Sequence, residues 1–389
     1  MSKEIAFVGA GLSCAVIARR LAEAGVHCTL FEKRDHIAGN CHTRRDPETG
    51  VMVHLFGPHI FHTSNEAVWN YVNRFADFGP FVNRVKAVTA RGVFSLPINL
   101  LTLNQLFGVN LTPKEAARLV EEKARPFKTG RETTFEEVAL SLVGEEIYRT
   151  FFYGYTKKQW GCEPSELPGY IIKRLPIRFT YEDDYYHDSH QGIPREGYTA
   201  MISKILDHPG IEVRLGHPFT PAEAAPFAHA VWSGPLDAFY GFRHGRLSYR
   251  TVFWKNERME GDAQGVACLN FTSEEVPHTR TIEHKFFTPW EKHGRTLLST
   301  EYSKATEPHE DPYYPVRSPA DLVMLDRYAR EAAREKAWSF VGRLGTYRYL
   351  DMHLIIEESL SFAEKAVAAI AGGTAWPVFP IPVEKFCKA

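Results

Sequence analysis

Near its start the chain reads Ile5-Ala6-Phe7-Val8-Gly9-Ala10-Gly11, then a helical pattern up to Gly25, then His27-Cys28-Thr29-Leu30-Phe31-Glu32. The apolar residues 5–8 are typical of a buried parallel strand. The two glycines permit a tight turn and let the backbone approach a pyrophosphate at the start of the next helix. Glu32 follows them by about 20 residues, where a carboxylate accepts hydrogen bonds from ribose hydroxyls. The complete unit therefore predicts dinucleotide binding rather than a plain βαβ unit.

The sequence has 389 residues, with 46 Lys or Arg against 47 Asp or Glu, and its formal net charge is −1. This length indicates two or three structural units. The balanced charge gives no sign of a nucleic-acid or anionic-membrane partner. No apolar run approaches the roughly 18 residues of a membrane-spanning helix, and the N-terminus enters a strand without a basic and apolar leader. We therefore expect no nucleic acid, no membrane association and a cytoplasmic location.

The six cysteines and 17 histidines form no metal-binding pattern. The cysteines include no C-x-x-C pair, which fits reduced thiols rather than a disulfide framework or a zinc site. The histidines have no ligand spacing among other potential ligands. We expect no metal.

A histidine-rich stretch, residues 53–63, places His54, His59 and His62 around a Gly57-Pro58 turn. One interpretation is a surface loop with solvated histidines. The other is a loop whose backbone and imidazoles pack against a ring system. The geometry of the Gly-Pro turn favours the second interpretation.

Residues 100–160 change to a helical period. Capping boxes at Thr112 and Thr134 each predict a helix start. The second helix would carry Val143, Ile147, Phe151 and Tyr155 at four-residue spacing. Its end, residues 151–161, combines Phe, Tyr and Trp with lysines and is too polar for plain packing. Such a face is typical of stacking on a planar or sugar ligand.

Residues 161–178 are rich in proline and glycine around Lys173-Arg174, which predicts a long loop with a short helical piece that can open and close over a site. Arg174 at its tip is either an ordinary solvated charge or a phosphate clamp delivered on closure.

Apolar and polar residues alternate in 81–97 and 249–287, which predicts antiparallel strands. Asn270 and Arg280 could project from the second group toward a ligand. Residues 199–215 and 228–237 carry helix and strand patterns that return to the α/β unit.

Near the C-terminus, residues 338–352 read as a strand, a glycine turn and a helix start that carries Asp351. This is a second helix N-terminus that can face a phosphate or a flavin carbonyl. The proline-rich residues 372–389 are predicted to form a tail along the surface.

Taken together, these segments resemble the bacterial UDP-galactopyranose mutase family, from Gly9 to about residue 360. The matching segments are 57–63, 154–161, 173–176, 233–237, 279–285 and 342–352. Their combination is highly specific, although no single segment is. Cys14 and Ala38 replace glycines that are usual in the family, and Cys41-His42 replaces a small-then-aromatic pair. We expect Cys14 to displace the first helix slightly without loss of binding.

The resemblance implies an FAD enzyme that interconverts UDP-galactopyranose and UDP-galactofuranose without net redox change. It implies that only the reduced flavin works, with N5 as the nucleophile at the anomeric carbon and UDP as the leaving group. An enzyme whose nucleophile belongs to the cofactor needs no Ser–His–Asp or Cys–His set, and the sequence contains none. A departing diphosphate calls for arginines instead.

The resemblance also assigns roles to single residues. Arg174 and Arg280 resemble the catalytic clamps on the diphosphate, and His59 lies close to the isoalloxazine. The residues implied in substrate binding are Asn83, Phe151, Tyr155, Trp160, Arg174, Tyr185, Asn270, Arg280, Tyr314 and Tyr349. The residues implied in FAD binding are Gly9, Gly11, Leu12, Glu32, Lys33, Asn40, Gly57, His59, Arg343, Asp351 and Met352.

We expect an α/β fold: a Rossmann-like FAD-binding domain with an inserted helical domain and an antiparallel β-sheet domain. The expected boundaries are 1–80, 193–243 and 335–370 for the discontinuous FAD-binding domain, 100–165 for the helical domain, 81–99, 166–192 and 244–320 for the sheet or substrate domain, and 371–389 for the tail. The implied partners are UDP-galactose, an external reductant of the flavin and a second copy in a homodimer.

Two alternatives remain open from the sequence. An FAD-dependent oxidoreductase of the amine-oxidase or monooxygenase type would share the first 40 residues and the glycine turn at 342–345. It would not need two arginines and a set of tyrosines around a diphosphate. The other alternative is a catalytically inert nucleotide-binding protein.

Overall fold

The first two strands belong to a five-stranded parallel sheet with the order β10-β2-β1-β11-β17. Its strands are β1 Glu4–Val8, β2 His27–Phe31, β10 Ile211–Arg214, β11 His229–Trp232 and β17 Trp338–Phe340. The computed structural model describes residues 4–174 and 177–387, with the side chains of residues 173 and 174 outside that description. The order of the strands confirms the Rossmann-like fold that the first 32 residues predict.

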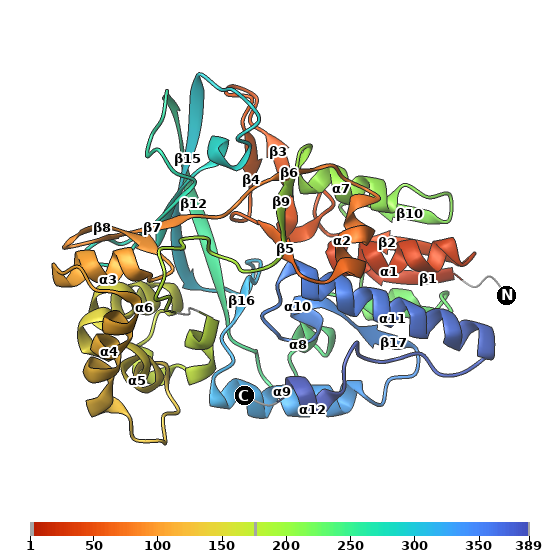
Figure 1. The fold of residues 1–389 in the computed structure, drawn as a ribbon. Helices are drawn as coiled ribbons and strands as arrows, with labels where there is room; N and C mark the ends of the chain where they lie inside the picture. The colour runs from red at the N-terminus through yellow and green to blue at the C-terminus, as the bar shows by residue number, and fades with distance from the viewer. Residues whose placement is uncertain (1–3, 175–176, 388–389) are drawn as a thin grey trace.

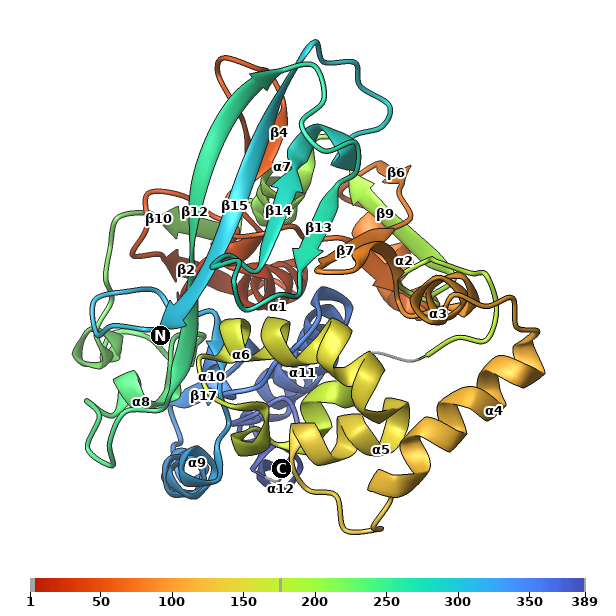
Figure 2. The same ribbon diagram turned by 90° about the vertical axis from the view of Figure 1, so that its left-hand side faces the viewer.

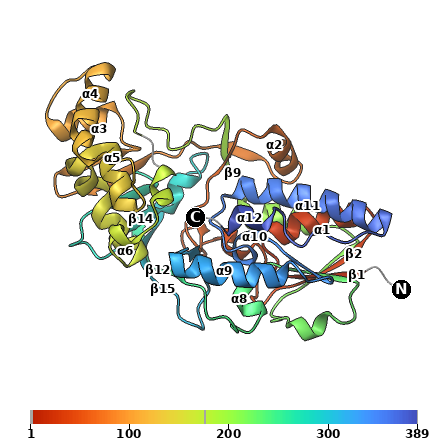
Figure 3. The ribbon, with the colours of Figure 1, turned by 90° about the horizontal axis from the view of Figure 1, so that it is seen from below.

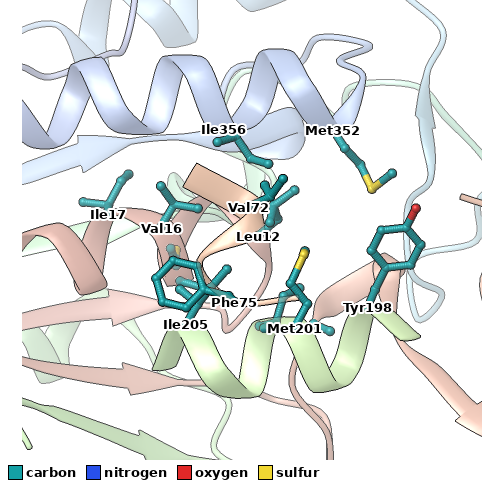
Figure 4. Close-up of a cluster of buried hydrophobic side chains, with 14 of the residues drawn as sticks. Leu12, Val16, Ile17, Val72, Phe75, Tyr198, Met201, Ile205, Met352 and Ile356 are labelled. Carbon is teal, nitrogen blue, oxygen red and sulfur yellow. The ribbon is translucent and has the colours of Figure 1, made fainter. Parts of the chain in front are cut away.

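Helices cover both faces of this sheet (Figures 1 and 3). One face is covered by three helices, α1 (Leu12–Glu23), α7 (Gly197–Leu206) and α11 (Met352–Gly372). Strand side chains alternate between the two faces: Ile5 and Phe7 of β1 pack on this one, and Ala6 packs on the other. Figure 4 shows the centre of this layer, where Val16 of α1, Ile205 of α7 and Ile356 of α11 converge. Burying aliphatic side chains of this size contributes about 1.5–3 kcal/mol each. Strand residues buried on both faces explain why the sequence shows continuous apolar runs.

The opposite face is covered by α8 (Leu236–Phe239), α9 (Pro319–Ala332) and the C-terminal residues, including α12 (Val383–Phe386). Phe386 is 1% exposed, and Phe379 packs against it with ring centroids 4.9 Å apart. The prediction of a tail along the surface is therefore wrong for these residues. Two aromatic side chains anchor the tail in the core, and the proline content of the segment concealed that signal.

A seven-stranded sheet stands beside the parallel sheet, in the order β16-β12-β15-β14-β13-β7-β8 (Figures 1 and 2). Its strands are β7 Val85–Thr89, β8 Gly92–Leu96, β12 Tyr249–Glu260, β13 Cys268–Phe271, β14 Arg280–Glu283, β15 Arg295–Ala305 and β16 Tyr314–Pro315. All neighbours are antiparallel except β13 and β7. The predicted antiparallel strands are confirmed. Their register sets Asn270 opposite Arg280, and Arg280 opposite Glu301.

The helical unit lies below the long strands β12 and β15, at the lower left of Figure 1. It contains α3 Leu100–Phe107, α4 Pro113–Ala124, α5 Phe135–Ile147, the π-helix η3 Tyr148–Tyr153 and α6 Gly154–Trp160. Both predicted capping boxes are confirmed: Thr112 and Thr134 each accept a hydrogen bond from the backbone N–H three residues later. These caps fix where α4 and α5 begin.

The expected continuous helix from residue 135 to Tyr155 is interrupted. Gly144 has φ 75° and ψ 170°, which breaks the helical path inside α5, and a π-helical segment precedes α6. A Cβ at Gly144 would lie 2.7 Å from the carbonyl oxygen of Lys123, so the backbones of α4 and α5 approach closely there. A φ of 75° with a ψ of 170° is accessible to glycine and disfavoured for other residues, so Gly144 permits the break.

Shorter elements complete the fold. They are η1 Gly39–Cys41, β3 Thr43–Arg45, β4 Met52–His54, β5 Phe61–Thr63, α2 Glu66–Asn73, β6 Phe78–Pro80, η2 Arg125–Phe127, η4 Pro164–Glu166, η5 Gly169–Arg174, β9 His190–Pro194, η6 Pro221–Ala224, η7 His284–Phe287 and α10 Gly342–Gly345. The short helical piece predicted within 161–178 is confirmed by η4 and η5. Its ability to open and close stays a prediction.

Candidate active site

The glycine turn after β1 makes a cradle that side chains would fill. Gly9 has φ 105°, and a Cβ there would lie 2.3 Å from Ser233 Oγ. Gly11 caps α1, and a Cβ added at Gly39 would lie 3.3 Å from the Gly11 Cα. No side chain at Gly9, Gly11 or Gly39 therefore covers the N–H groups at the start of α1. This geometry suits the close approach of a pyrophosphate to a helix N-terminus.

A cavity of about 690 Å³ lies at this turn, at the carboxyl edge of the parallel sheet. Nine of the predicted cofactor residues line it: Gly9, Gly11, Leu12, Glu32, Lys33, Asn40, His59, Arg343 and Met352. Gly57 and Asp351 are not among its lining residues. Gly57 (φ 97°) faces the Trp254 ring and the Arg280 guanidinium, and Asp351 is the N-cap residue of α11.

Glu32 is held in a fixed orientation at the wall of this cavity. Its Oε2 accepts a hydrogen bond from the backbone N–H of Ala10 at 2.9 Å, and its Oε1 accepts one from the N–H of Arg34 at 3.0 Å. A carboxylate oxygen has more than one lone pair, so both oxygens keep capacity for a ribose hydroxyl. The cradle, the cavity and the acid together fit the adenosine diphosphate half of FAD.

Two departures from the usual glycines lie in the same region. Ala38 adopts a left-handed conformation, φ 78° and ψ −1°, which costs a non-glycine residue about 1–2 kcal/mol. Its backbone N–H donates to the Ala10 carbonyl at 2.9 Å, which holds the turn against the cradle. Cys14 is fully buried, and its thiol points toward the Val8 carbonyl at 3.9 Å. The small displacement expected of α1 at Cys14 stays a prediction.

Asp311 joins the far connector to the end of β2, and sequence reasoning missed it. Its carboxylate accepts hydrogen bonds from Lys33 Nζ at 2.5 Å and from Arg34 Nη2 at 2.6 Å. Burial opposes ionisation, but the Lys33 hydrogen bond and the Arg34 charge hold the pKa of Asp311 below its ordinary value. Arg34 also donates to Asn40 Oδ1 at 3.0 Å. All four residues line the larger cavity, so this network closes one of its sides.

A second cavity, of about 140 Å³, lies between the helical unit and the seven-stranded sheet. Five predicted substrate residues line it: Phe151, Tyr155, Trp160, Tyr185 and Asn270. Asn83 is buried nearby, and its carbonyl accepts a hydrogen bond from the Tyr185 N–H at 2.8 Å. Its side-chain Oδ1 has no hydrogen-bond partner among the described residues. An aromatic cavity with few polar groups is typical of a site for a planar ligand.

Arg280 is oriented by a buried carboxylate, Glu301. Arg280 donates to Glu301 Oε2 from Nε at 2.8 Å and from Nη2 at 2.5 Å, and Glu301 is 1% exposed. Thr279 Oγ1 donates to the other oxygen, Oε1, at 2.7 Å. Within the part of the chain that the structure describes, Arg280 Nη1 has no recorded partner. The guanidinium is therefore fixed on one edge and available on the other, as a clamp requires.

Tyr314 and Tyr349, two predicted substrate residues, line neither cavity but lie beside the larger one. The rings of Tyr314 and Tyr349 stack with centroids 5.7 Å apart, and the Arg343 guanidinium, in the wall of the larger cavity, lies 5.1 Å from the Tyr349 centroid. Tyr185 belongs to the smaller cavity. Burial raises the pKa of Tyr185 and of Tyr314 to about 12. Both phenols therefore stay protonated at neutral pH and can donate hydrogen bonds to phosphate oxygens.

His59 is a neutral imidazole in the wall of the larger cavity. Burial, with a further contribution from the Arg343 charge, lowers the pKa of His59 to about 4. Its Nδ1 lies 2.8 Å from the Gly57 carbonyl oxygen, which can only accept. The proton of the neutral ring therefore sits on Nδ1, and Nε2 is left as an acceptor. The loop is packed against the cofactor cavity, not a solvated surface loop.

Arg174 is a predicted clamp whose side chain lies outside the described part of the structure, so its role stays a prediction.

Glu301 is the other site residue that sequence reasoning missed. It is an isolated acid in the run Ser299-Thr300-Glu301-Tyr302 of an alternating strand, and only the pairing of β14 with β15 sets it opposite Arg280.

None of the described helices has the length and apolar character to cross a membrane. Within residues 4–174 and 177–387, no cluster of three or more His, Cys, Asp or Glu side chains could hold a metal ion.

The fold and the larger cavity define a dinucleotide-binding protein. Residues 8–75 match the model of the NAD(P)-binding Rossmann-like domain, and residues 150–349 match the model of the UDP-galactopyranose mutase family. The chain is 50% identical to a probable UDP-galactopyranose mutase of Klebsiella pneumoniae, over 98% of this chain and 99% of that protein. It is 44% identical to a dTDP-fucopyranose mutase of Escherichia coli, over 93% and 97%.

The fold agrees with these relatives. A crystal structure of reduced UDP-galactopyranose mutase superposes with a TM-score of 0.74 at 16% identity, over 96% of each chain. The chain therefore belongs to the UDP-galactopyranose mutase family. It is an isomerase and a flavoprotein whose cofactor is FAD.

Proposed function

We propose that the chain interconverts UDP-galactopyranose and UDP-galactofuranose. The observation that carries this proposal is the pairing of a cofactor cavity with a smaller aromatic cavity, with the charge of Arg280 acting on His59 of the first and on Tyr155 of the second. An oxidase of small amines would not need this combination. A nucleotide-linked sugar does, because its diphosphate is the leaving group and must be recaptured.

In this proposal the smaller cavity takes the nucleotide. Phe151, Tyr155 and Asn270 contact the uridine, and Asn83 and Trp160 lie near the sugar. Asn83 Oδ1, a buried acceptor without a partner among the described residues, is free to bind a sugar hydroxyl. An unsatisfied buried acceptor costs about 1–3 kcal/mol, which a ligand hydrogen bond would recover.

The diphosphate is held by arginines and tyrosines. Arg280, fixed by Glu301, and Arg174, on η5, clamp the phosphates, and Tyr185, Tyr314 and Tyr349 donate hydroxyl hydrogen bonds. Each charge-assisted hydrogen bond is worth about 1.5–3 kcal/mol. Two such clamps favour departure of UDP and hold it for return.

The cofactor residues hold the flavin beside this site. FAD, when bound and reduced, would supply the nucleophile N5 for the anomeric carbon. The glycine cradle and Glu32 would hold its adenosine diphosphate part, and Arg343, Met352 and Asp351 would hold the rest. His59 presents Nε2 as an acceptor and, being neutral at pH 7, adds no charge near the flavin.

Several finer points belong to the same proposal. They are an external reductant for the flavin, a homodimer, a cytoplasmic location, and the division into FAD-binding, helical and sheet domains given above. The similarity to a dTDP-fucopyranose mutase makes a dTDP-linked 6-deoxy sugar the second candidate substrate.

The test compares the two candidate substrates on the reduced enzyme. We expect dithionite-reduced protein to convert UDP-galactopyranose with a kcat/KM at least about tenfold above that for dTDP-fucopyranose, a preference of about 1.4 kcal/mol. The reverse preference would transfer the proposal to the dTDP sugar. An enzyme that oxidises either sugar, or consumes an oxidant in proportion to product, would contradict it.

A further inference from the structure

Lys158 of α6 makes an unusual set of contacts outside both cavities. Its ammonium donates to the carbonyl oxygens of Phe271 and Ser273, each at 2.7 Å, and of Val276 and His278, each at 2.9 Å. An ammonium has three N–H groups, so four carbonyls share three hydrogens. Within the described residues no carboxylate forms an ion pair with Lys158. Its hydrogen bonds therefore all go to backbone carbonyls, and the nearest acid, Glu274, acts on its charge from beyond ion-pair distance.

These carbonyls all belong to residues 271–278, that is, the last residue of β13 and most of the loop that leads to β14; we call this segment the 271–278 connection. Asn270 directly precedes this connection and Arg280 begins the strand after it. Tyr155 and Trp160 lie on the same helix as Lys158 and line the smaller cavity opposite Asn270. One side chain thus ties together two walls of the cavity that belong to elements more than 100 residues apart in sequence.

Two further contacts hold α6 against the seven-stranded sheet. A Cβ at Gly154, the first residue of α6, would lie 2.3 Å from the Thr272 carbonyl oxygen, so helix and loop meet backbone to backbone. At the other end of α6, Arg250 of β12 donates to the Gln159 carbonyl from Nε at 3.0 Å. Figures 2 and 3 both draw α6 directly beside the strands of the seven-stranded sheet.

We propose that Lys158 is a positioning residue for nucleotide binding: it fixes the 271–278 connection against α6 and so sets the spacing between Tyr155 and Asn270. The assignment rests on the proposed function, because it takes the smaller cavity as the nucleotide site. Lys158 itself does not line that cavity. Its effect on the ligand passes through the two walls that it joins.

The test replaces Lys158 by Met, which keeps the length of the stem and removes all donors. We expect the affinity for UDP alone, measured by calorimetry on the FAD-loaded protein, to fall by about tenfold or more, since several buried carbonyls lose their donor. KM for UDP-galactose should rise more than kcat falls. Amide hydrogen exchange in 271–278 should become faster, while the flavin absorbance spectrum stays unchanged.

Lys157 offers a comparison on the same helix, because it also reaches the 271–278 connection, but only through a more exposed ion pair with Glu274. Its ammonium is more exposed and pairs with the carboxylates of Glu163 at 2.7 Å and Glu274 at 2.9 Å. Exposed ion pairs contribute about 1 kcal/mol or less, so Lys157→Met should change UDP affinity by no more than about threefold. Lys158→Arg keeps the charge in a wider, planar group that cannot serve four carbonyls, and we expect an intermediate loss of affinity.

The outcomes separate the two claims. If the unsubstituted protein does not bind UDP, the proposed function is wrong and this assignment falls with it. If the unsubstituted protein binds UDP and Lys158→Met binds it equally well, only the assignment is overturned. Should Lys158→Met fail to accumulate as folded protein, Lys158→Arg decides the question, and UDP affinity within twofold of the unsubstituted value overturns the assignment.

Discussion

Arg280 is the described side chain whose removal should affect turnover most. Arg280→Ala takes away the diphosphate clamp, and we expect kcat/KM for UDP-galactose to fall by about 100- to 1,000-fold, as for loss of one preorganised transition-state donor. The flavin spectrum should remain, because Arg280 does not line the cofactor cavity. The same loss is expected for Arg174→Ala. The measurement is product formation by the reduced enzyme, followed chromatographically.

Arg295 on the neighbouring strand β15 serves as the control. It pairs with Glu260 at the surface and should tolerate substitution by Ala with full activity.

Arg280→Ala also leaves Glu301 buried without its cation, so we expect the free energy of unfolding to fall by about 3–5 kcal/mol. Unchanged turnover in both Arg280→Ala and Arg174→Ala would refute the clamp assignment.

Buried histidines should make the fold sensitive to acid. Burial lowers the pKa of His229 to about 4 and of His284 to about 3. In the unfolded chain the pKa is about 6.5, so between these values the unfolded state binds more protons and the free energy of unfolding falls as the pH falls. From pH 7 to pH 5 each histidine should cost about 2 kcal/mol.

Urea unfolding of the protein and of His229→Gln at pH 7 and pH 5 measures this effect. The variant should lose about 2 kcal/mol less between the two pH values than the unsubstituted protein does, whatever its stability at pH 7. Identical losses would show that His229 does not titrate during unfolding in this range.

At the scale of elements, Gly144 sets the break inside α5 and its close approach to α4. Gly144→Ala forces a side chain into φ 75° and sets its Cβ 2.7 Å from the Lys123 carbonyl oxygen. Gly130 has the same φ of 75°, but nothing lies within 4 Å of its Cβ position. We therefore expect Gly130→Ala to cost about 1 kcal/mol and Gly144→Ala to cost at least about 2 kcal/mol more. Thermal unfolding of both variants, with equal losses as the contradicting result, tests this assignment.

The sequence predicts most elements because their signals are local. Capping boxes placed the starts of α4 and α5, alternation placed β7, β8 and β12–β14, and the glycine turn placed α1. The break at Gly144 was missed because a four-residue apolar stripe looks the same in a straight helix and in one that bends between turns. The position of Gly144 against Lys123 depends on packing between two helices, which no local pattern encodes.

The residues of the candidate site likewise fall into those that a local motif predicts and those that only distant contacts place. Residues in recognisable motifs, such as Glu32 and Tyr155, were predicted and line the two cavities. Asp311, which meets Lys33 across 278 residues, and Glu301, which orients Arg280, were not. Their roles arise from the register of distant strands and loops, and acids of this kind are indistinguishable from surface residues in the sequence.

At the scale of the whole molecule, the C-terminal residues close the second face of the parallel sheet. Phe386→Ala removes a 1% exposed ring from the core that includes Phe340 and Phe379, and we expect a loss of about 3–5 kcal/mol. The exposed neighbour Lys385 should tolerate Ala within about 0.5 kcal/mol. Urea unfolding of the two variants measures the difference, and a loss below about 1 kcal/mol for Phe386→Ala would place the tail on the surface after all.

The central claim is that a flavoprotein fold here performs an isomerisation without consuming electrons. The most direct measurement reduces the FAD-loaded protein once with dithionite, without oxygen, adds UDP-galactopyranose in large excess, and identifies the sugar ring by NMR. We predict many molecules of UDP-galactofuranose per flavin, with the flavin still reduced at the end. An unchanged ring in UDP-galactose, or one molecule of product per reoxidised flavin, would contradict the account.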